Sequence, residues 1–168
     1  MPVRPATPAD VAFIRRIAGR IDNARFIADE PDAKILAHMQ APDREVVIWS
    51  RDGNRLGFGL FAEIGDPSGR IELRRLGLNR IDGGLGRVFI NELTDYAFDR
   101  LQAQRLWLDA VLENTRAQAV YDRAGFAREG IQRRHWKRPC GDVSDLVLFG
   151  MLREEWEALR AASGEVSV

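Results

Sequence analysis

The feature that most constrains the fold is a change of pattern near residue 80, where strand-like segments are followed by a glycine-rich loop. Residues 46–49, 56–64 and 70–78 are rich in aliphatic, β-branched and aromatic side chains, and turn sequences containing Asp-Gly and Pro-Ser-Gly separate them. Such a series predicts a meander of three antiparallel strands. Residues 85–100 then carry apolar side chains at helical spacing, so we expect a helix directly after the loop.

The flanking segments extend this pattern into a larger mixed fold. Before the meander, the sequence predicts a short first strand, a helix at residues 8–21 and a second helix that begins near Pro31. After the glycine loop and its helix, it predicts a strand at 106–111, a helix at 114–124, strands from 126 and at 145–152, and a helix at 154–161. A strand–helix–strand crossover gives a parallel strand pair, so we expect an α/β or α+β fold with three layers.

Length and composition indicate one globular domain over residues 1–168. The chain has 45% hydrophobic and 30% charged residues, and its formal net charge is zero. Zero net charge argues against a nucleic-acid partner. A lone cysteine, Cys140, cannot form an internal disulfide, and we see neither a signal-peptide pattern nor an apolar stretch that could cross a membrane. We therefore expect a cytoplasmic protein without a membrane partner.

The strand at residues 70–78 breaks its own alternation. Its apolar residues occupy odd positions before Arg74 and even positions after Arg75. One extra residue restores the register, so the sequence predicts a β-bulge at Arg74–Arg75. A bulge turns backbone N–H groups away from the sheet, where they can bind a carbonyl oxygen that gains negative charge in acyl transfer. An edge irregularity without a function explains the same pattern.

The glycine loop, residues 82–86, is suited to an anion. Glycines let backbone amides approach a ligand closely, and the helix that follows presents its positive N-terminus. Arg80 and Arg87 flank the loop. The alternative is a plain helix entry. Without a Gly-Lys-Ser/Thr ending the loop is not a P-loop, and no early strand–GxGxxG–helix unit indicates a Rossmann site.

A third segment runs from Asn114 to Phe126. Asn114 is a typical helix N-cap, and Tyr121 follows it by about two helical turns, so both lie on one side of the helix. The alternative for Tyr121 is a packed aromatic ring with a hydrated hydroxyl.

Taken in order, these segments carry a resemblance. The bulged strand, the Gly84-Leu85-Gly86 loop, the helix, the strand and the pattern Asn114…Tyr121-x-x-x-Gly125-Phe126 resemble the GNAT superfamily of N-acetyltransferases. Residues 145–156 are similar to its ribosomal-protein-alanine acetyltransferase-like branch. The resemblance implies a GNAT fold with a mixed, mostly antiparallel sheet of six to seven strands and helices on both faces. It also implies acetyl-CoA as co-substrate, no metal, and direct acetyl transfer to a primary amine in a ternary complex.

The resemblance assigns roles to individual residues. It implies that Tyr121 protonates the departing thiolate, that the strand end at residues 76–78 pairs with the pantetheine arm, and that the loop amides hold the pyrophosphate. The implied cofactor-binding residues are Leu76, Gly77, Leu78, Arg80, Asp82, Gly83, Gly84, Leu85, Gly86, Arg87, Asn114 and Arg116. Where the family usually has Arg or Gln, three residues before the first glycine of Gly-x-Gly, this chain has Ile81, and Arg80 is the candidate replacement.

The amine must lose a proton before it attacks, and the base is less constrained than the acid. Glu72, on the bulged strand, is the first candidate, Glu113 is the second, and deprotonation in bulk water is the third. A tyrosine titrates at about 10, so Tyr121 keeps its proton at neutral pH. His135 is expected in an exposed hairpin loop, which the resemblance places beside the acceptor site, and His38 on the surface of the second helix.

Several alternatives remain open at this point. The acceptor can be a peptide N-terminus, an amino acid, a polyamine or an antibiotic amine, and the resemblance favours a peptide N-terminus or a small amino compound. A non-catalytic CoA-binding module with the same fold is the first alternative function, and a structural dimerisation domain is the second. A homodimer is compatible with all three.

Overall fold

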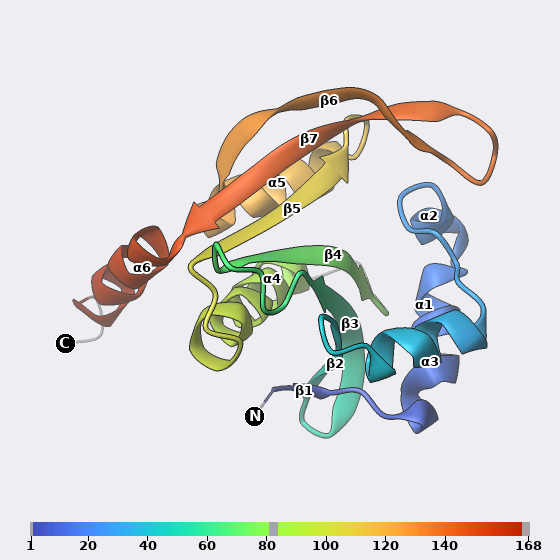
Figure 1. Ribbon diagram of the computed structural model, residues 1–168, viewed down its shortest axis with the longest axis horizontal. Coiled ribbons are helices and arrows are strands. Elements are labelled where there is room, and N and C mark those ends of the chain that lie inside the picture. Colours follow the sequence, from blue (N-terminus) through green and yellow to red (C-terminus); the bar gives the residue numbers. More distant parts are fainter. Residues whose placement is uncertain (1, 81–83, 166–168) are drawn as a thin grey trace.

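A computed structural model describes residues 2–80 and 84–165 of the chain. Figure 1 shows a central sheet with helices packed on both of its faces. The elements, in chain order, are β1 (Val3–Pro5), the 3-10 turn η1 (Pro8–Asp10), α1 (Val11–Ala18), α2 (Ile21–Ala24), α3 (Asp32–Gln40), β2 (Glu45–Arg51), β3 (Asn54–Ala62), β4 (Arg70–Leu78), α4 (Leu85–Asp95), the π-helical turn η2 (Tyr96–Arg100), β5 (Arg105–Val111), α5 (Thr115–Ala124), β6 (Ala127–Lys137), β7 (Val143–Leu152) and α6 (Arg153–Glu165).

The strands confirm the predicted sheet. Within the described residues, seven strands form one sheet in the order β1-β2-β3-β4-β5-β7-β6. Only β4 and β5 pair in parallel, as the crossover through α4 requires, and the other neighbours are antiparallel. The mixed, mostly antiparallel sheet with helices on both faces is therefore the fold that the sequence predicts. No helix in the described part of the chain is both long and apolar enough to cross a bilayer.

Side-chain alternation along β2 builds a core on each face of the sheet. Val47 and Trp49 point to the face covered by α4, where Trp49 packs against Phe89 with ring centroids 5.1 Å apart. Val46 and Ile48 belong to the cluster on the opposite face, which includes the buried side chains of α1. Each helix layer thus buries its apolar stripe against one parity of the strand residues.

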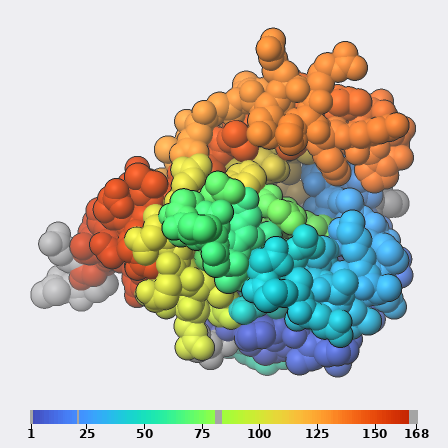
Figure 2. Space-filling model, in the orientation of Figure 1, coloured from blue at the N-terminus to red at the C-terminus, as the bar shows by residue number. Residues whose placement is uncertain are grey.

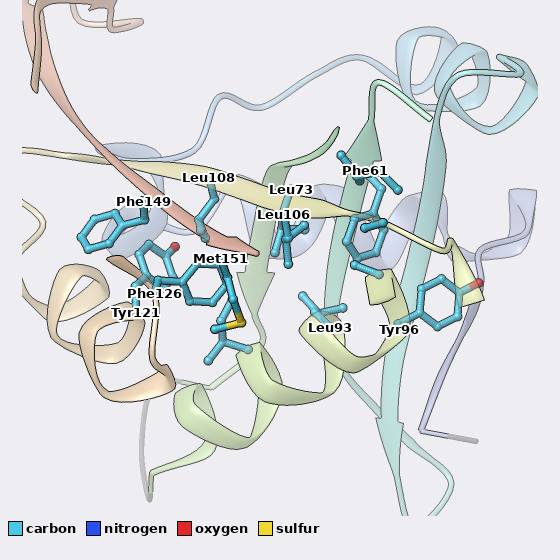
Figure 3. Close-up of a cluster of buried hydrophobic side chains, with 14 of the residues drawn as sticks. Phe61, Leu73, Leu93, Tyr96, Leu106, Leu108, Tyr121, Phe126, Phe149 and Met151 are labelled. Atoms are coloured by element: carbon cyan, nitrogen blue, oxygen red, sulfur yellow. The ribbon is translucent and has the colours of Figure 1, made fainter. Parts of the chain in front are cut away.

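The core under α4 and α5 fixes the position of Tyr121. Figure 3 shows its ring among the buried side chains of this cluster, beside Phe126 and Phe149. The rings of Tyr121 and Phe149 meet edge to face, with centroids 5.3 Å apart at 75°. Aromatic contacts of this geometry hold a ring in one orientation. The packing therefore fixes the position of the Tyr121 side chain.

The predicted bulge is confirmed in β4. Leu60 of β3 pairs with Arg75 and the next residue, Phe61, pairs with Leu73, so Arg74 is the extra residue. On the other side, β5 pairs with β4 only at residues 70–72. Beyond Glu72 the two strands diverge, as Figure 1 shows. The divergence opens the sheet between them.

The helix predicted at residues 8–21 is divided. The 3-10 turn η1 precedes α1, which ends at Ala18 with Gly19 as C-cap, and α2 begins at Ile21. The Asn23 side chain donates a 2.9 Å hydrogen bond from Nδ2 to the carbonyl oxygen of Ile17. This bond satisfies one of the carbonyls that the end of α1 exposes.

Two expectations about histidines are wrong. His135, with Trp136 and Lys137, lies in β6 and not in the hairpin loop, because this strand extends to Lys137 before the turn. His38 is buried, at 5% exposure, because its ring nitrogens are held between Glu30 and Arg44 at 2.9 and 2.7 Å. Hydrogen bonds to both ring nitrogens offset the loss of water when the ring is buried.

Candidate active site

A cleft of about 1050 Å³ opens where β4 and β5 diverge. Side chains from β4, β5, α4, α5 and β6 line it, together with residues around α2. Figure 2 shows the surface hollowed between the β6–β7 hairpin, in orange, and the N-terminal helices, in blue to cyan. This volume is slightly above the usual range for sites that bind small molecules, about 300–1000 Å³.

One wall of the cleft is the end of β4. Leu76, Gly77 and Leu78 line it, as the sequence predicts. The amide of Asn79 donates to Leu56 of β3, so by alternation the amides of Leu76 and Leu78 face away from β3. No described strand pairs with them there, because β5 has already diverged. An extended amide-containing ligand can hydrogen-bond to such an edge.

Glycine is required at position 77 by close packing. A Cβ atom there would lie 2.7 Å from Cγ2 of Ile17 and 2.9 Å from the Phe58 ring. Both contacts are far shorter than normal van der Waals distances. Gly77 therefore lets β4 lie close to α1 at the point where the strand lines the cleft.

The N-terminus of α4 forms the next part of the wall. Gly84 is its N-cap with φ 72°, a conformation that favours glycine. Gly84, Leu85, Gly86 and Arg87 line the cleft, so the exposed amides and the positive end of the helix are available to an anion. Asp82 and Gly83, two further residues of the predicted loop, and Ile81 lie outside the described residues.

Arg80 and Arg116 have different positions. Arg116 and Arg123, both on α5, line the cleft. Arg80 lies two residues after the end of β4 and is not among the described residues that line the cleft. Arg87, Arg116 and Arg123 thus bring positive charge to the cleft, and the sequence did not single out Arg123.

Helix α5 brings Asn114 and Tyr121 to the same cleft. Asn114 is the predicted N-cap, and its Oδ1 accepts a 3.2 Å hydrogen bond from the Ala117 amide. Tyr121 is 5% exposed, and its hydroxyl has no hydrogen-bond partner among the residues that the structure describes. Burial raises the pKa of Tyr121, and the negative charge of Asp109 raises it further. The phenol therefore remains protonated at neutral pH and is available as a donor.

The two predicted bases have different surroundings. Glu72 lines the cleft at 8% exposure and accepts a 2.8 Å hydrogen bond from Nε of Arg74. Glu113 is exposed and pairs with Nη2 of Arg138 at 2.7 Å, and it is absent from the described cleft lining. The structure therefore brings Glu72, and not Glu113, to the site.

Asp109 is the acid that the sequence analysis missed. It lies on β5, lines the cleft and is mostly buried. Burial raises its pKa from 3.8 to about 6, the charge of Glu72 adds to this rise, and His135 opposes it. The available signal was its position, because a carboxylate in the middle of an interior strand is unusual. Its closeness to Glu72 depends on how two strands diverge, which no local pattern encodes.

The other end of the cleft is formed by segments distant in the sequence. Phe26, Ile27 and Glu30 contribute from the chain around and after α2. His135 and Trp136 contribute from β6, so the predicted nearness of His135 to the site holds although its element was wrong. This end is both aromatic and charged, which suits a small polar acceptor or the end of a peptide.

The cleft combines four chemical features. It has an unpaired strand edge, a positively charged helix N-terminus, a protonated phenol and a pair of carboxyl groups, one with a pKa near neutrality. These features can bind an extended phosphorylated thioester, protonate a leaving group and accept a proton from an amine. Within residues 2–80 and 84–165, no group of three or more His, Cys, Asp or Glu side chains is arranged to hold a metal ion.

This fold and cleft define the class of acyltransferases that draw an acyl group from CoA. Comparison with known families assigns the chain within that class. It belongs to the Acetyltransferase (GNAT) family, whose profile matches residues 13–126, more than half of the 168 residues. The matched region includes the bulged strand, the glycine loop, Asp109 and Tyr121.

Individual relatives are more distant. A curated relative, "Putative ribosomal N-acetyltransferase YdaF" of Bacillus subtilis, is 36% identical over 66 residues, which cover 39% of this chain and 36% of that protein. Among solved structures, a spermidine N-acetyltransferase chimera of Vibrio cholerae SpeG and hSSAT superposes with a TM-score of 0.80 at 19% identity, covering 92% of this chain and 96% of that chain. The Vibrio cholerae spermidine N-acetyltransferase in complex with CoA and spermine gives 0.77 at 19% identity, with the same two coverages. At 19% identity, these two similarities show a shared fold.

Proposed function

We propose that the protein transfers the acetyl group of acetyl-CoA directly to a primary amine. The observation that carries the proposal is the cleft between the diverging strands, because it lines up a binding edge, a proton donor and a proton acceptor in one cavity. Membership of the GNAT family supports acetyl-CoA as the co-substrate. Its thioester supplies an activated acetyl group, so the protein needs no nucleophile of its own.

In this proposal the co-substrate lies along β4 and α4. The backbone of residues 76–78 pairs with the pantetheine arm, and the amides at Gly84–Gly86 hold the pyrophosphate, with charge added by Arg87 and Arg116. Asn114 borders the same path. Contributions from Arg80, Asp82 and Gly83 remain predictions.

Tyr121 is the proposed general acid. Its raised pKa keeps the phenol protonated at neutral pH. A thiol titrates at about 8.5, so full proton transfer from the phenol to the departing thiolate is uphill, while a hydrogen bond from it is favourable. The aromatic packing around Tyr121 keeps the donor in position during the reaction.

Asp109 is the proposed proton acceptor, with Glu72 as its partner. Glu72 already accepts hydrogen bonds from Arg74, which leaves it less available to an amine. Asp109 has a pKa of about 6, so it is mostly ionised at neutral pH and still basic enough to take a proton. Burial raises this pKa most, and the negative charge of Glu72 adds to the rise. Deprotonation in bulk water is the competing route.

The test is an assay of thiol release from acetyl-CoA over a panel of primary amines, with mass spectrometry of the products. We expect turnover with at least one amine, and each product heavier by one acetyl group. The alternative, a CoA-binding module without catalysis, would give thermal stabilisation by acetyl-CoA and no turnover with any amine. Failure of CoA to raise the melting temperature would leave only a structural role.

The setting of this activity is also a proposal. The single cysteine and the zero net charge support one cytoplasmic domain over residues 1–168, without nucleic-acid or membrane partners. One structure of the Vibrio cholerae spermidine N-acetyltransferase is described as dodecameric. For this chain a homodimer is an alternative to a monomer, and light scattering distinguishes them.

A further inference from the structure

The bulge in β4 brings two consecutive arginines to one cavity. In a regular strand, successive side chains point to opposite faces. Arg74 is the extra residue of the bulge, and both Arg74 and Arg75 line the cleft. They lie between Glu72 and the end of β4 that we assign to the co-substrate. Two guanidinium groups therefore border the part of the cleft next to the proposed base.

These arginines neutralise the acids around them. Arg74 pairs with Glu72, with Nη2 and a carboxylate oxygen 2.6 Å apart, and Arg75 pairs through Nη1 with Glu30, also at 2.6 Å. Glu30 is paired further with Lys34 and His38, each at 2.9 Å. A polycation binds through uncompensated carboxylates, and these two acids are already compensated.

Each arginine also keeps donor capacity that its acid does not use. Nη2 of Arg75 is buried without a hydrogen-bond partner among the described residues, and burial lowers the pKa of this side chain. Arg74 uses Nε and Nη2 for Glu72. Its Nη1 has no partner in the described part of the chain, and its side chain is 38% exposed in the cleft. A buried guanidinium nitrogen without an acceptor is unfavourable, and an anionic group of a ligand would supply the missing acceptor.

We propose that Arg74 and Arg75 form an anion-binding subsite, and that the acceptor is an amine that carries a carboxylate close to the reacting nitrogen. The inference rests on the proposed function and specifies its substrate class. The carboxylate has two sources, the α-carboxylate of a free amino acid or an acidic side chain next to a peptide N-terminus. Guanidinium groups recognise either through paired hydrogen bonds. Polyamines such as spermidine, which lack an anion, are then poor acceptors.

The test compares matched acceptors that differ in one charge, with kcat/KM calculated for the unprotonated amine because a neighbouring carboxylate also raises the pKa of the amino group. L-Alanine is paired with L-alaninamide, and the peptide Ala-Asp-Gly amide with Ala-Asn-Gly amide, with spermidine as the cationic acceptor. We expect kcat/KM to favour the anionic member of one pair by about tenfold or more, and the pair that responds identifies the source of the carboxylate. Equal values within both pairs, or a preference for spermidine, would overturn the subsite.

Variants connect this preference to the arginines. Arg74→Gln is the main variant because Arg74 is partly exposed, and we expect it to bring the ratio within the responding pair close to one. Arg75→Lys tests the second guanidinium without removing the charge that Glu30 requires. Arg51→Gln, at the exposed end of β2, removes one arginine far from the cleft lining, and we expect it to leave the ratio unchanged. An unchanged ratio in Arg74→Gln would contradict the assignment.

A binding measurement separates this inference from the proposed function. Calorimetry in the presence of CoA compares N-acetyl-L-alanine with N-acetyl-L-alaninamide, and the two acetylated peptides with each other. Tighter binding of an anionic member that Arg74→Gln abolishes supports the subsite even if no amine is turned over. Turnover of amines without any such difference would support the transferase and refute the subsite.

Discussion

The carboxyl group of Asp109 and the hydroxyl group of Tyr121 owe their chemistry to burial. Both side chains line the cleft, and for both burial is the largest cause of a raised pKa. Burial disfavours the charged form of an acid. One environment therefore produces an ionisable carboxyl group near neutrality and a phenol that stays protonated.

The same burial means that ionised Asp109 lowers the free energy of unfolding at neutral pH. Its pKa is about 6 in the folded protein and 3.8 ordinarily, so the folded state binds the proton more tightly. The favourable contribution is fully present below 3.8 and is lost as the pH rises through about 6. We predict that Asp109→Asn raises the free energy of unfolding by about 1–3 kcal/mol at neutral pH and by less at about pH 5. Urea unfolding at both pH values measures this, and equal stability of the two proteins at neutral pH would contradict it.

The proposed role of Asp109 also predicts a pH dependence of the rate. The groups that influence its carboxyl group are Glu72, His135 and Tyr121. Because the base must be ionised, we expect kcat/KM for the amine to rise with pH through about 6 before the amine's own ionisation contributes. Asp109→Asn should lower the rate and remove this limb. If the rise in kcat/KM near pH 6 persists in the variant, a group other than Asp109 causes it.

Tyr121 provides a separate prediction. In Tyr121→Phe the ring and its packing against Phe149 are kept, and only the hydroxyl group is lost. We expect kcat to fall by about 100-fold or more, as for loss of a general acid, with little change in the dissociation constant of acetyl-CoA. Steady-state rates and calorimetry measure the two quantities. Equal rates would remove Tyr121 from the mechanism.

At the scale of elements, the site depends on the junction between β4, α4 and α5. Gly86 lies in the first turn of α4, and a Cβ atom there would lie 3.5 Å from Cγ2 of Val120 on α5, an ordinary contact. A methyl group therefore fits, whereas a larger side chain extends into the cleft or against α5.

We predict opposite results for two substitutions at this position. Gly86→Ala should keep acetyl-CoA binding and stabilise the helix by about 0.5–1 kcal/mol. Gly86→Phe should weaken acetyl-CoA binding by about tenfold or more, because the ring occupies the space beside the helix amides. Calorimetric titration and thermal unfolding of both variants are the measurements. Unchanged affinity in Gly86→Phe would place the pyrophosphate elsewhere.

The same scale explains what could be predicted from the sequence. The bulge at Arg74 was predictable because a period of two assigns each residue of a strand to a face, and one break in it is visible. The N-cap at Asn114 and the helix after Gly84 follow from local preferences in the same way. The extent of β6 was not predictable, because this edge strand is exposed along most of its length and lacks alternation.

The candidate site was only partly predictable for a related reason. The strand edge, the turn proposed to bind an anion, and Tyr121 each lie within one short segment. The nearness of Asp109 to Glu72 arises where β5 separates from β4, and the pairing of Arg75 with Glu30 joins residues 45 positions apart. Contacts of this kind depend on the assembled fold and leave no local pattern.

At the scale of the whole molecule, the cleft is placed where the two halves of the sheet separate. Strands β1 to β4 pack on one side of the gap and β5 to β7 on the other, and the shared core beneath them, shown in Figure 3, holds the halves together. The binding surface is therefore part of the architecture of the sheet.

Where β4 and β5 diverge, residues 76–78 form a strand edge that has no neighbouring strand on that side among the described residues. A bound pantetheine arm would complete that ladder, so the ligand acts on the protein as a missing strand would. We predict that amide hydrogens of Leu76 and Leu78 exchange with solvent rapidly without acetyl-CoA and become protected when it binds, while the Gly77 amide, which faces β3, changes little. Hydrogen exchange followed by nuclear magnetic resonance resolves the three amides, and uniform protection of all three in both states would contradict the proposed pairing.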